Sequence, residues 1–120
     1  MSEILIVNSM CGRALAIATI LENAGYSVLL ASNAQEARVI ATTKQPSLIL
    51  IGKTKEILFH EITTLRLHPT LAMVPIILET EEFSLLNEAY RSRLNVSAIV
   101  SSPVTSEQLL KAVGYFLKAA

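Results

Sequence analysis

The stretch Pro46-Ser47-Leu48-Ile49-Leu50-Ile51-Gly52 is a short, almost wholly apolar run that begins at a proline and ends at a glycine. Such runs, rich in β-branched residues and bounded by turn residues, are typical of strands buried on both faces. Two similar runs flank it in the sequence, Ile4-Leu5-Ile6-Val7 and Val74-Pro75-Ile76-Ile77-Leu78. Because none of the three alternates between apolar and polar residues, they predict a parallel sheet with helices on both faces.

The whole chain divides into an alternation of strands and helices. We expect strands at 3–7, 26–31, 46–52, 74–78 and 96–100, and helices at 11–24, 34–43, 57–67, 82–92 and 105–118. The expected helix caps are Asn8 or Ser9, Ser32 or Asn33, Thr105 with Gln108, and, at the end of the first helix, Gly25. Right-handed crossovers then give a (βα)5 doubly wound α/β domain, a flavodoxin-like five-stranded parallel sheet with strand order 2-1-3-4-5. Sheets of this kind place their functional site at the carboxyl ends of the strands.

Length and composition set broad limits on function. The 120 residues fit a single domain over 1–120, and 52% hydrophobic with only 17% charged residues favours a protein partner or self-association. The formal net charge is zero and the basic residues are scattered, so we expect no nucleic-acid binding. No apolar run reaches membrane-spanning length and the N-terminus lacks a signal peptide, which predicts a cytoplasmic protein without membrane contact.

Two residue counts limit the chemistry further. Cys11 is the only cysteine, which excludes an intramolecular disulfide framework and a multi-cysteine metal site. We expect Cys11 to be a small buried hydrophobe, with a redox role at a helix N-terminus as the alternative. The chain contains no aspartate, and all ten acidic residues are glutamate. Chemistry that needs an aspartyl carboxylate therefore cannot occur in this chain.

Six stretches share a pattern that spans the whole chain. They are Ile4-Leu5-Ile6-Val7, Leu21-Glu22-Asn23-Ala24-Gly25-Tyr26, Ala31-Ser32-Asn33-Ala34-Gln35-Glu36-Ala37, Pro46-Ser47-Leu48-Ile49-Leu50-Ile51, Val74-Pro75-Ile76-Ile77 and Ser102-Pro103-Val104-Thr105-Ser106-Glu107-Gln108-Leu109-Leu110. In this order they resemble the receiver domain of bacterial two-component response regulators. The resemblance implies a signalling domain that binds magnesium through an acidic pair after the first strand and accepts a phosphoryl group on an aspartate ending the third. It also implies a Ser or Thr after the fourth strand and a Lys before the proline after the fifth, both engaging the phosphate.

The positions that carry this chemistry differ here. The matching residues are Asn8 and Ser9 for the acidic pair, Gly52 for the acceptor, Thr80 for the hydroxyl and Ser102 for the lysine. Only Thr80 keeps its family type, and Ile99 stands where receivers often carry an aromatic residue that rotates on activation. Asn8 and Ser9 supply only neutral ligands for magnesium, and glycine has no nucleophile. The resemblance therefore implies a pseudo-receiver that has lost phosphorylation.

The main hypothesis is a signalling module, not an enzyme, that binds proteins independently of phosphorylation and needs no cofactor. Its partner would be a signalling kinase, an output domain or a second copy in a homodimer. The candidate interface, on the face that receivers use for dimers and effectors, consists of Phe83, Leu86, Tyr90, Tyr115 and Lys118. Leu15 and Ala16 offer a second apolar contact surface. The alternative is a small-ligand or cofactor sensor that uses the vestigial pocket, formed by Asn8, Ser9, Gly52, Thr80 and Ser102.

The remaining polar candidates have simpler interpretations. Glu79, Glu81 and Glu82 form an acidic cluster after the fourth strand, which we expect to supply loop charge at a helix N-terminus, with metal ligation as the alternative. His60 and His68 have no partner at metal-ligand spacing and are expected on the surface.

Overall fold

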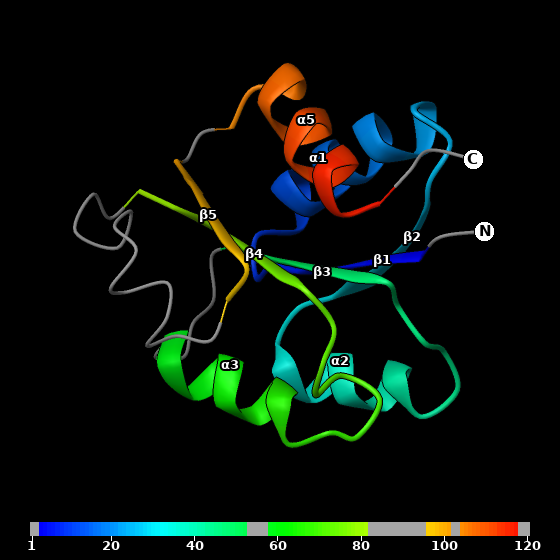
Figure 1. Cartoon of the computed structure of the whole chain (residues 1–120), viewed down its shortest axis with the longest axis vertical. Helices are drawn as coiled ribbons and strands as arrows, with labels where there is room; N and C mark the ends of the chain where they lie inside the picture. Colours follow the sequence, from blue (N-terminus) through cyan, green and yellow to red (C-terminus); the bar gives the residue numbers. More distant parts are fainter. Residues whose placement is uncertain (1–2, 53–57, 82–95, 102–103, 118–120) are drawn as a thin grey trace.

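The computed structural model describes residues 3–52, 58–81, 96–101 and 104–117. Its elements are β1 (Glu3–Val7), α1 (Cys11–Asn23), β2 (Ser27–Ala31), α2 (Ala34–Ala41), β3 (Leu48–Ile51), α3 (Leu58–Arg66), β4 (Ile76–Thr80), β5 (Ala98–Ser101) and α5 (Ser106–Phe116). The five strands are parallel and lie in the order β2-β1-β3-β4-β5 (Figure 1). The predicted flavodoxin-like sheet and its strand order are confirmed.

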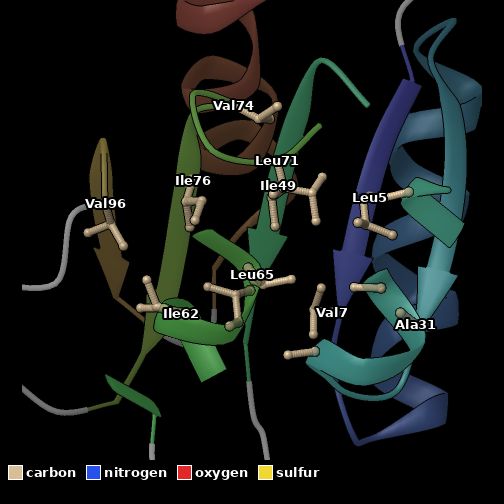
Figure 2. Packing of buried hydrophobic residues seen from close by; sticks show 14 of the residues in the cluster. Leu5, Val7, Ala31, Ile49, Ile62, Leu65, Leu71, Val74, Ile76 and Val96 are labelled. Carbon is tan, nitrogen blue, oxygen red and sulfur yellow. The ribbon is translucent and has the colours of Figure 1, made fainter. Parts of the chain in front are cut away.

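Helices cover both faces of the sheet: α1 and α5 lie on one side, and α2 and α3 on the other (Figure 1). Alternate strand residues enter two separate cores, because successive side chains of a strand point to opposite faces. Ile4 and Ile6 join the core under α1 and α5, whereas Leu5 and Val7 join the core under α2 and α3, part of which Figure 2 shows. All four residues of β3 are buried. The prediction that the central strand is buried on both faces is therefore confirmed.

Two predicted strands are displaced along the chain. The fourth strand, expected at 74–78, is Ile76–Thr80, and the fifth, expected at 96–100, is Ala98–Ser101. The ladders set these ends, because Ile51 pairs with Leu78 and Thr80 pairs with Ser101. Val74 instead belongs to a turn, in which its N–H donates to the Leu71 carbonyl. The predicted helix at 82–92 lies outside the described residues.

The helix ends test the predicted caps. Asn33 caps α2 by accepting a hydrogen bond from the Glu36 N–H, and Thr105 with Gln108 forms a capping box at α5, as predicted. Gly25, with φ of +99°, follows α1 at the expected place. The expected side-chain cap of α1 was wrong. Met10 is its N-cap and makes no side-chain cap bond, because the side chain of Asn8 turns back to accept a hydrogen bond from the Met10 N–H instead.

A buried carboxylate connects α2 and α3. Glu61 of α3 is 2% exposed, and its Oε2 accepts a hydrogen bond of 2.7 Å from the N–H of Ala34, the first residue of α2. A negative charge is favourable at a helix N-terminus, where backbone N–H groups lack partners. Glu61 thus fixes the start of α2 against α3.

Among the helices in the described ranges, none is long and apolar enough to cross a membrane.

Candidate functional site

Three residues at the carboxyl edge of the sheet form one row. Val7 pairs with Ile51 and Ile51 with Leu78, so the residues that follow them, Asn8, Gly52 and Glu79, are neighbours across β1, β3 and β4. The alternation that places Ile6, Leu50 and Ile77 in the core under α1 and α5 directs these three residues to the same face. The row lies where a doubly wound sheet carries its site.

Asn8 occupies the space above Gly52. A Cβ built on Gly52 would lie 2.6 Å from Asn8 Nδ2, a separation that requires one of the two to move. Asn8 is 3% exposed and is held at both ends: its N–H donates to the Ala31 carbonyl at 3.0 Å, and its Oδ1 accepts from the Met10 N–H at 2.9 Å. Any side chain at position 52 would therefore displace a buried, hydrogen-bonded amide.

Glu79 makes an ion pair across the same site. Its carboxylate lies 2.5 Å (Oε2) from a terminal nitrogen of Arg13 on α1, and Arg13 Nε donates to Oε1 at 3.3 Å. Oε2 also accepts a hydrogen bond of 3.2 Å from the N–H of Val104, just before α5. The Glu79 side chain is 10% exposed and that of Arg13 is 30% exposed. The hydrogen bond to Glu79 is the largest cause of the raised pKa of Arg13.

This ion pair corrects the expectation for the acidic cluster. Glu79 is a residue of β4 whose carboxylate pairs with the half-buried Arg13, and not a loop charge at a helix N-terminus. Glu81 is exposed, and Glu82 lies outside the described residues. The Glu79 carboxylate connects β4 to Arg13 of α1 and to the Val104 N–H just before α5.

A small cavity lies beneath the row. It has a volume of about 20 Å³ and is lined mainly by apolar side chains, including Ile6, Ile17 and Leu50, with Asn8 and Glu79 at its polar end. A cavity needs about 10–15 Å³ to hold one water molecule, so this one holds about one. This cavity is therefore too small for an organic ligand or cofactor.

The other residues of the vestigial pocket are placed as follows. Ser9 is half-buried, and half-buried Thr80 is the last residue of β4, paired with Ser101. Ile99 is partly buried against the core under α2 and α3. Ser102 lies outside the described residues.

Most of the predicted interface falls on chain that the structure does not describe, namely Phe83, Leu86, Tyr90 and Lys118. Tyr115 is 84% exposed on α5 and packs edge to face with Phe116, at a ring-centroid distance of 5.0 Å. With Ser97, Ala98 and Ala112 these two rings line an open groove between β5 and α5.

Three further expectations concern single residues. Cys11 is exposed at the first residue of α1, so the expected buried position was wrong. His60 is exposed as predicted. His68 is half-buried, because its Nδ1 accepts a hydrogen bond from the Thr70 N–H within the turn after α3.

No sequence pattern predicted a role for Arg13 at this site. It is the only charged residue between positions 4 and 21, within an otherwise apolar strand and helix. An isolated charge in such a segment needs a partner or exposure. An acidic partner is one of these two outcomes, but the sequence does not indicate which of the ten glutamates it is.

The residues of the site do not fit the magnesium ion that the receiver resemblance implies. Magnesium is bound through carboxylates in near-octahedral geometry. Asn8 offers a neutral oxygen that already accepts the Met10 N–H, and the Glu79 carboxylate is neutralised by Arg13. Within the described ranges, no three His, Cys, Asp or Glu residues gather as a metal site. No step through magnesium follows for this chain.

Comparison by sequence finds no matching family model and no matching curated protein. Comparison by structure finds receiver domains. The chain is similar to the chemotaxis protein CheY4 of Vibrio cholerae, with a TM-score of 0.86 at 22% identity over 98% of this chain and 99% of that one. It is also similar to a response regulator from Desulfuromonas acetoxidans, with a TM-score of 0.84 at 22% identity over 98% of both chains.

A third similar structure is the receiver domain of the sensor histidine kinase PA1611 from Pseudomonas aeruginosa PAO1, in which a magnesium ion is coordinated in the active-site cleft. Its TM-score is 0.80 at 19% identity, over 96% of both chains. Likeness at these identities establishes the fold. The chain therefore has the receiver-domain fold over nearly its whole length, as the resemblance predicted.

Proposed function

We propose that this chain is a pseudo-receiver, a receiver-fold signalling module that binds a protein partner without phosphoryl transfer. The observation that carries the proposal is the packing of the Asn8 amide against Gly52, where a Cβ at position 52 would lie 2.6 Å from Nδ2. Phosphoryl transfer to this site would need a nucleophile, and glycine has none. The chain has no aspartate at any other position to replace it.

The charges around the site support the same conclusion. Phosphoryl transfer depends on cations that stabilise the charge developing on the transferred group. Among the residues that the structure describes, the cation at this site is Arg13, and it already pairs with Glu79. A phosphoryl group would have to compete with this carboxylate for Arg13. The Arg13–Glu79 pair therefore connects α1 to β4, and Arg13 is not available to bind an anion.

The proposed partner is a protein: a signalling kinase, an output domain or a second copy, in the cytoplasm of a bacterium. The exposed aromatic surface of α5 supports a protein contact, because tyrosine is enriched in interfaces. Tyr115 is 84% exposed beside the groove that Phe116 and Ala98 help to line. We propose that this groove is where the partner binds.

Intact-mass spectrometry tests the absence of phosphoryl transfer. The full chain is incubated with acetyl phosphate and magnesium, and separately with an autophosphorylated histidine kinase from the same cells. We expect the mass to remain that of the unmodified chain under both conditions. A covalent phosphate on the folded protein would overturn the proposal, whichever residue carries it.

A capture experiment tests the binding surface. The tagged chain is incubated with native cell extract without any phosphodonor, and the same is done with Tyr115→Glu and Val39→Glu. Val39 is a matched control, because it is 70% exposed on α2, on the other side of the sheet. We expect a partner that binds the wild type and Val39→Glu but is lost with Tyr115→Glu. Equal capture by all three proteins would contradict the proposed surface.

A further inference from the structure

The outer edge of β2 is an unprotected strand edge. In the part of the chain that the structure describes, β2 pairs with β1 alone and lies at the end of the sheet opposite β5 (Figure 1). Natural proteins protect such edges with charged residues, proline or bulges, because an edge strand offers backbone groups to other strands. The sequence of β2 is Ser-Val-Leu-Leu-Ala, with no charge and no proline.

The ladder with β1 shows which backbone groups of β2 point outward. Ala31 is directed toward β1, since its carbonyl accepts the Asn8 N–H at 3.0 Å and the register pairs it with Val7. Alternate residues of a strand direct their N–H and C=O to opposite sides, so Leu29 also faces β1. Val28 and Leu30 therefore present their N–H and C=O groups away from the sheet. No cap or turn bond among the described residues uses these groups.

An apolar rim runs beside this edge. The side chain of Val28 packs in the core under α1, so Leu30, two residues on, points to the same face, where it is 42% exposed. On α1, Arg13 points toward β4, and Leu15 lies two residues further along, about 200° around the helix. Leu15 consequently faces the β2 side, where it is 51% exposed. Leu15 and Leu30 are thus both exposed apolar side chains on the α1 side of the sheet.

We propose that the β2 edge binds the β2 edge of a second copy of this chain, antiparallel, with the two-fold axis at Leu29. Val28 of each copy then lies opposite Leu30 of the other, and each such pair exchanges two backbone hydrogen bonds. The two sheets join into one continuous sheet of ten strands. Leu15 and Leu30 of both copies flank the joint on one face.

The pattern of the strand favours a second copy over an unrelated partner. A two-fold axis needs a self-complementary edge, and the outward groups of Val28 and Leu30 are symmetric about Leu29. Like charges would repel across such an axis, but β2 carries none and the whole chain has a formal net charge of zero. The β2 edge lies at the opposite end of the sheet from the groove between β5 and α5. The proposed dimer is therefore independent of the proposed function.

Sedimentation equilibrium of the full chain tests the proposal. We expect a dimer in the wild type. Val28→Pro removes an outward N–H without touching the ladder to β1, and Leu30→Lys places a charge on the edge. We expect each variant to weaken dimerisation at least tenfold, whereas the exposed Val39→Lys on α2 has no effect. Circular dichroism verifies that each variant is folded. A wild type that stays monomeric up to about 1 mM, or a Val28→Pro variant that dimerises normally, overturns the proposal.

Cross-linking tests the register without relying on a disruptive variant. The two copies of residue 29 form a non-hydrogen-bonded antiparallel pair, with a Cα separation of about 4.5 Å that a disulfide can span. The two copies of residue 28 are about 7–8 Å apart and cannot be joined as readily. In a Cys11→Ser background, we expect oxidation to link Leu29→Cys into a covalent dimer much faster than Val28→Cys. Equal rates, or faster linking of Val28→Cys, would overturn the register.

Discussion

The side-chain amide of Asn8 lies where a side chain at residue 52 would stand, 2.6 Å from the position of a Cβ on Gly52. The two residues follow paired strands, and the amide is held by its hydrogen bond to the Met10 N–H. The glycine and the buried amide therefore depend on one another. This pair fills the carboxyl edge of the sheet between β1 and β3 with packed, neutral atoms.

Substitution of Gly52 measures this dependence. Gly52→Ala forces Asn8 to shift, and overpacking of a closed site costs about 1–3 kcal/mol. We expect Gly52→Ala to lower the free energy of unfolding by about that amount in urea titrations. In an Asn8→Ala background the added methyl group has room, so the cost should shrink by more than half. Equal costs in both backgrounds would show that the two residues do not interact.

Gly114 supplies the matched control for that experiment. It lies within α5, and a Cβ built on it meets no atom within 4 Å. Alanine is preferred over glycine in a helix by about 0.5–1 kcal/mol. We expect Gly114→Ala to raise the free energy of unfolding, which is opposite in sign to the effect at Gly52.

Removal of the ion pair tests the tether between α1, β4 and α5. Glu79→Ala loses the Arg13 contacts and the Val104 hydrogen bond, whereas Arg13→Ala removes the ion pair but leaves Glu79 to accept the Val104 N–H. Hydrogen bonds to charged groups contribute about 1.5–3 kcal/mol, reduced here because Arg13 is 30% exposed. We expect unfolding free energies to fall by about 1–3 kcal/mol for Glu79→Ala and by less for Arg13→Ala.

A double-mutant cycle isolates the pair itself. The double variant Arg13→Ala/Glu79→Ala should be more stable than the sum of the single effects predicts, because each single change leaves its partner uncompensated. Glu22→Ala on the exposed side of α1 is the control and should change stability by less than about 0.5 kcal/mol. Additive effects at Arg13 and Glu79 would contradict the tether.

Glu61 should be among the most sensitive polar residues of the described chain. Its carboxylate is 2% exposed and accepts the Ala34 N–H, so Glu61→Ala leaves a buried N–H without a partner. An unsatisfied buried group costs about 1–3 kcal/mol. We expect a loss of that size for Glu61→Ala in thermal or urea unfolding, and a smaller loss for Glu61→Gln, which keeps an acceptor oxygen.

Glu36 is the comparison residue for Glu61. It also accepts a backbone N–H near the start of α2, that of Ser32, but it is exposed. Water replaces the lost acceptor there, so Glu36→Ala should cost less than about 1 kcal/mol. A cost at Glu36 equal to that at Glu61 would mean that burial is not the cause.

Removal of the Thr105 hydroxyl tests the capping box of α5. Thr105→Ala removes the acceptor for the Gln108 N–H at 3.1 Å and should destabilise the protein by about 1 kcal/mol. Thr105→Ser keeps the hydroxyl and should restore most of the stability. Ser106→Ala, at the next position, should be nearly neutral. If Thr105→Ser is as unstable as Thr105→Ala, the hydroxyl is not the stabilising group.

The amino-acid sequence was sufficient for the fold. The apolar runs of β1 and β3 required burial on both faces, and only a parallel sheet between two layers of helices provides it. Local chemistry also predicted the Asn33 cap, the Thr105 capping box and the turn at Gly25, since each depends on residues within one turn of chain. Strand ends were less accurate, because the ladder and not local propensity decides where β4 begins.

The absence of aspartate is also evident from the sequence alone. The arrangement of the site is not. Arg13 and Glu79 are 66 residues apart. The periodicity of neither segment predicts that these two side chains form a pair. Their pairing follows from the strand order and register, which bring α1, β4 and the start of α5 to one edge. Composition and spacing determine which residues are buried, but only the packed sheet determines which buried charges and amides meet.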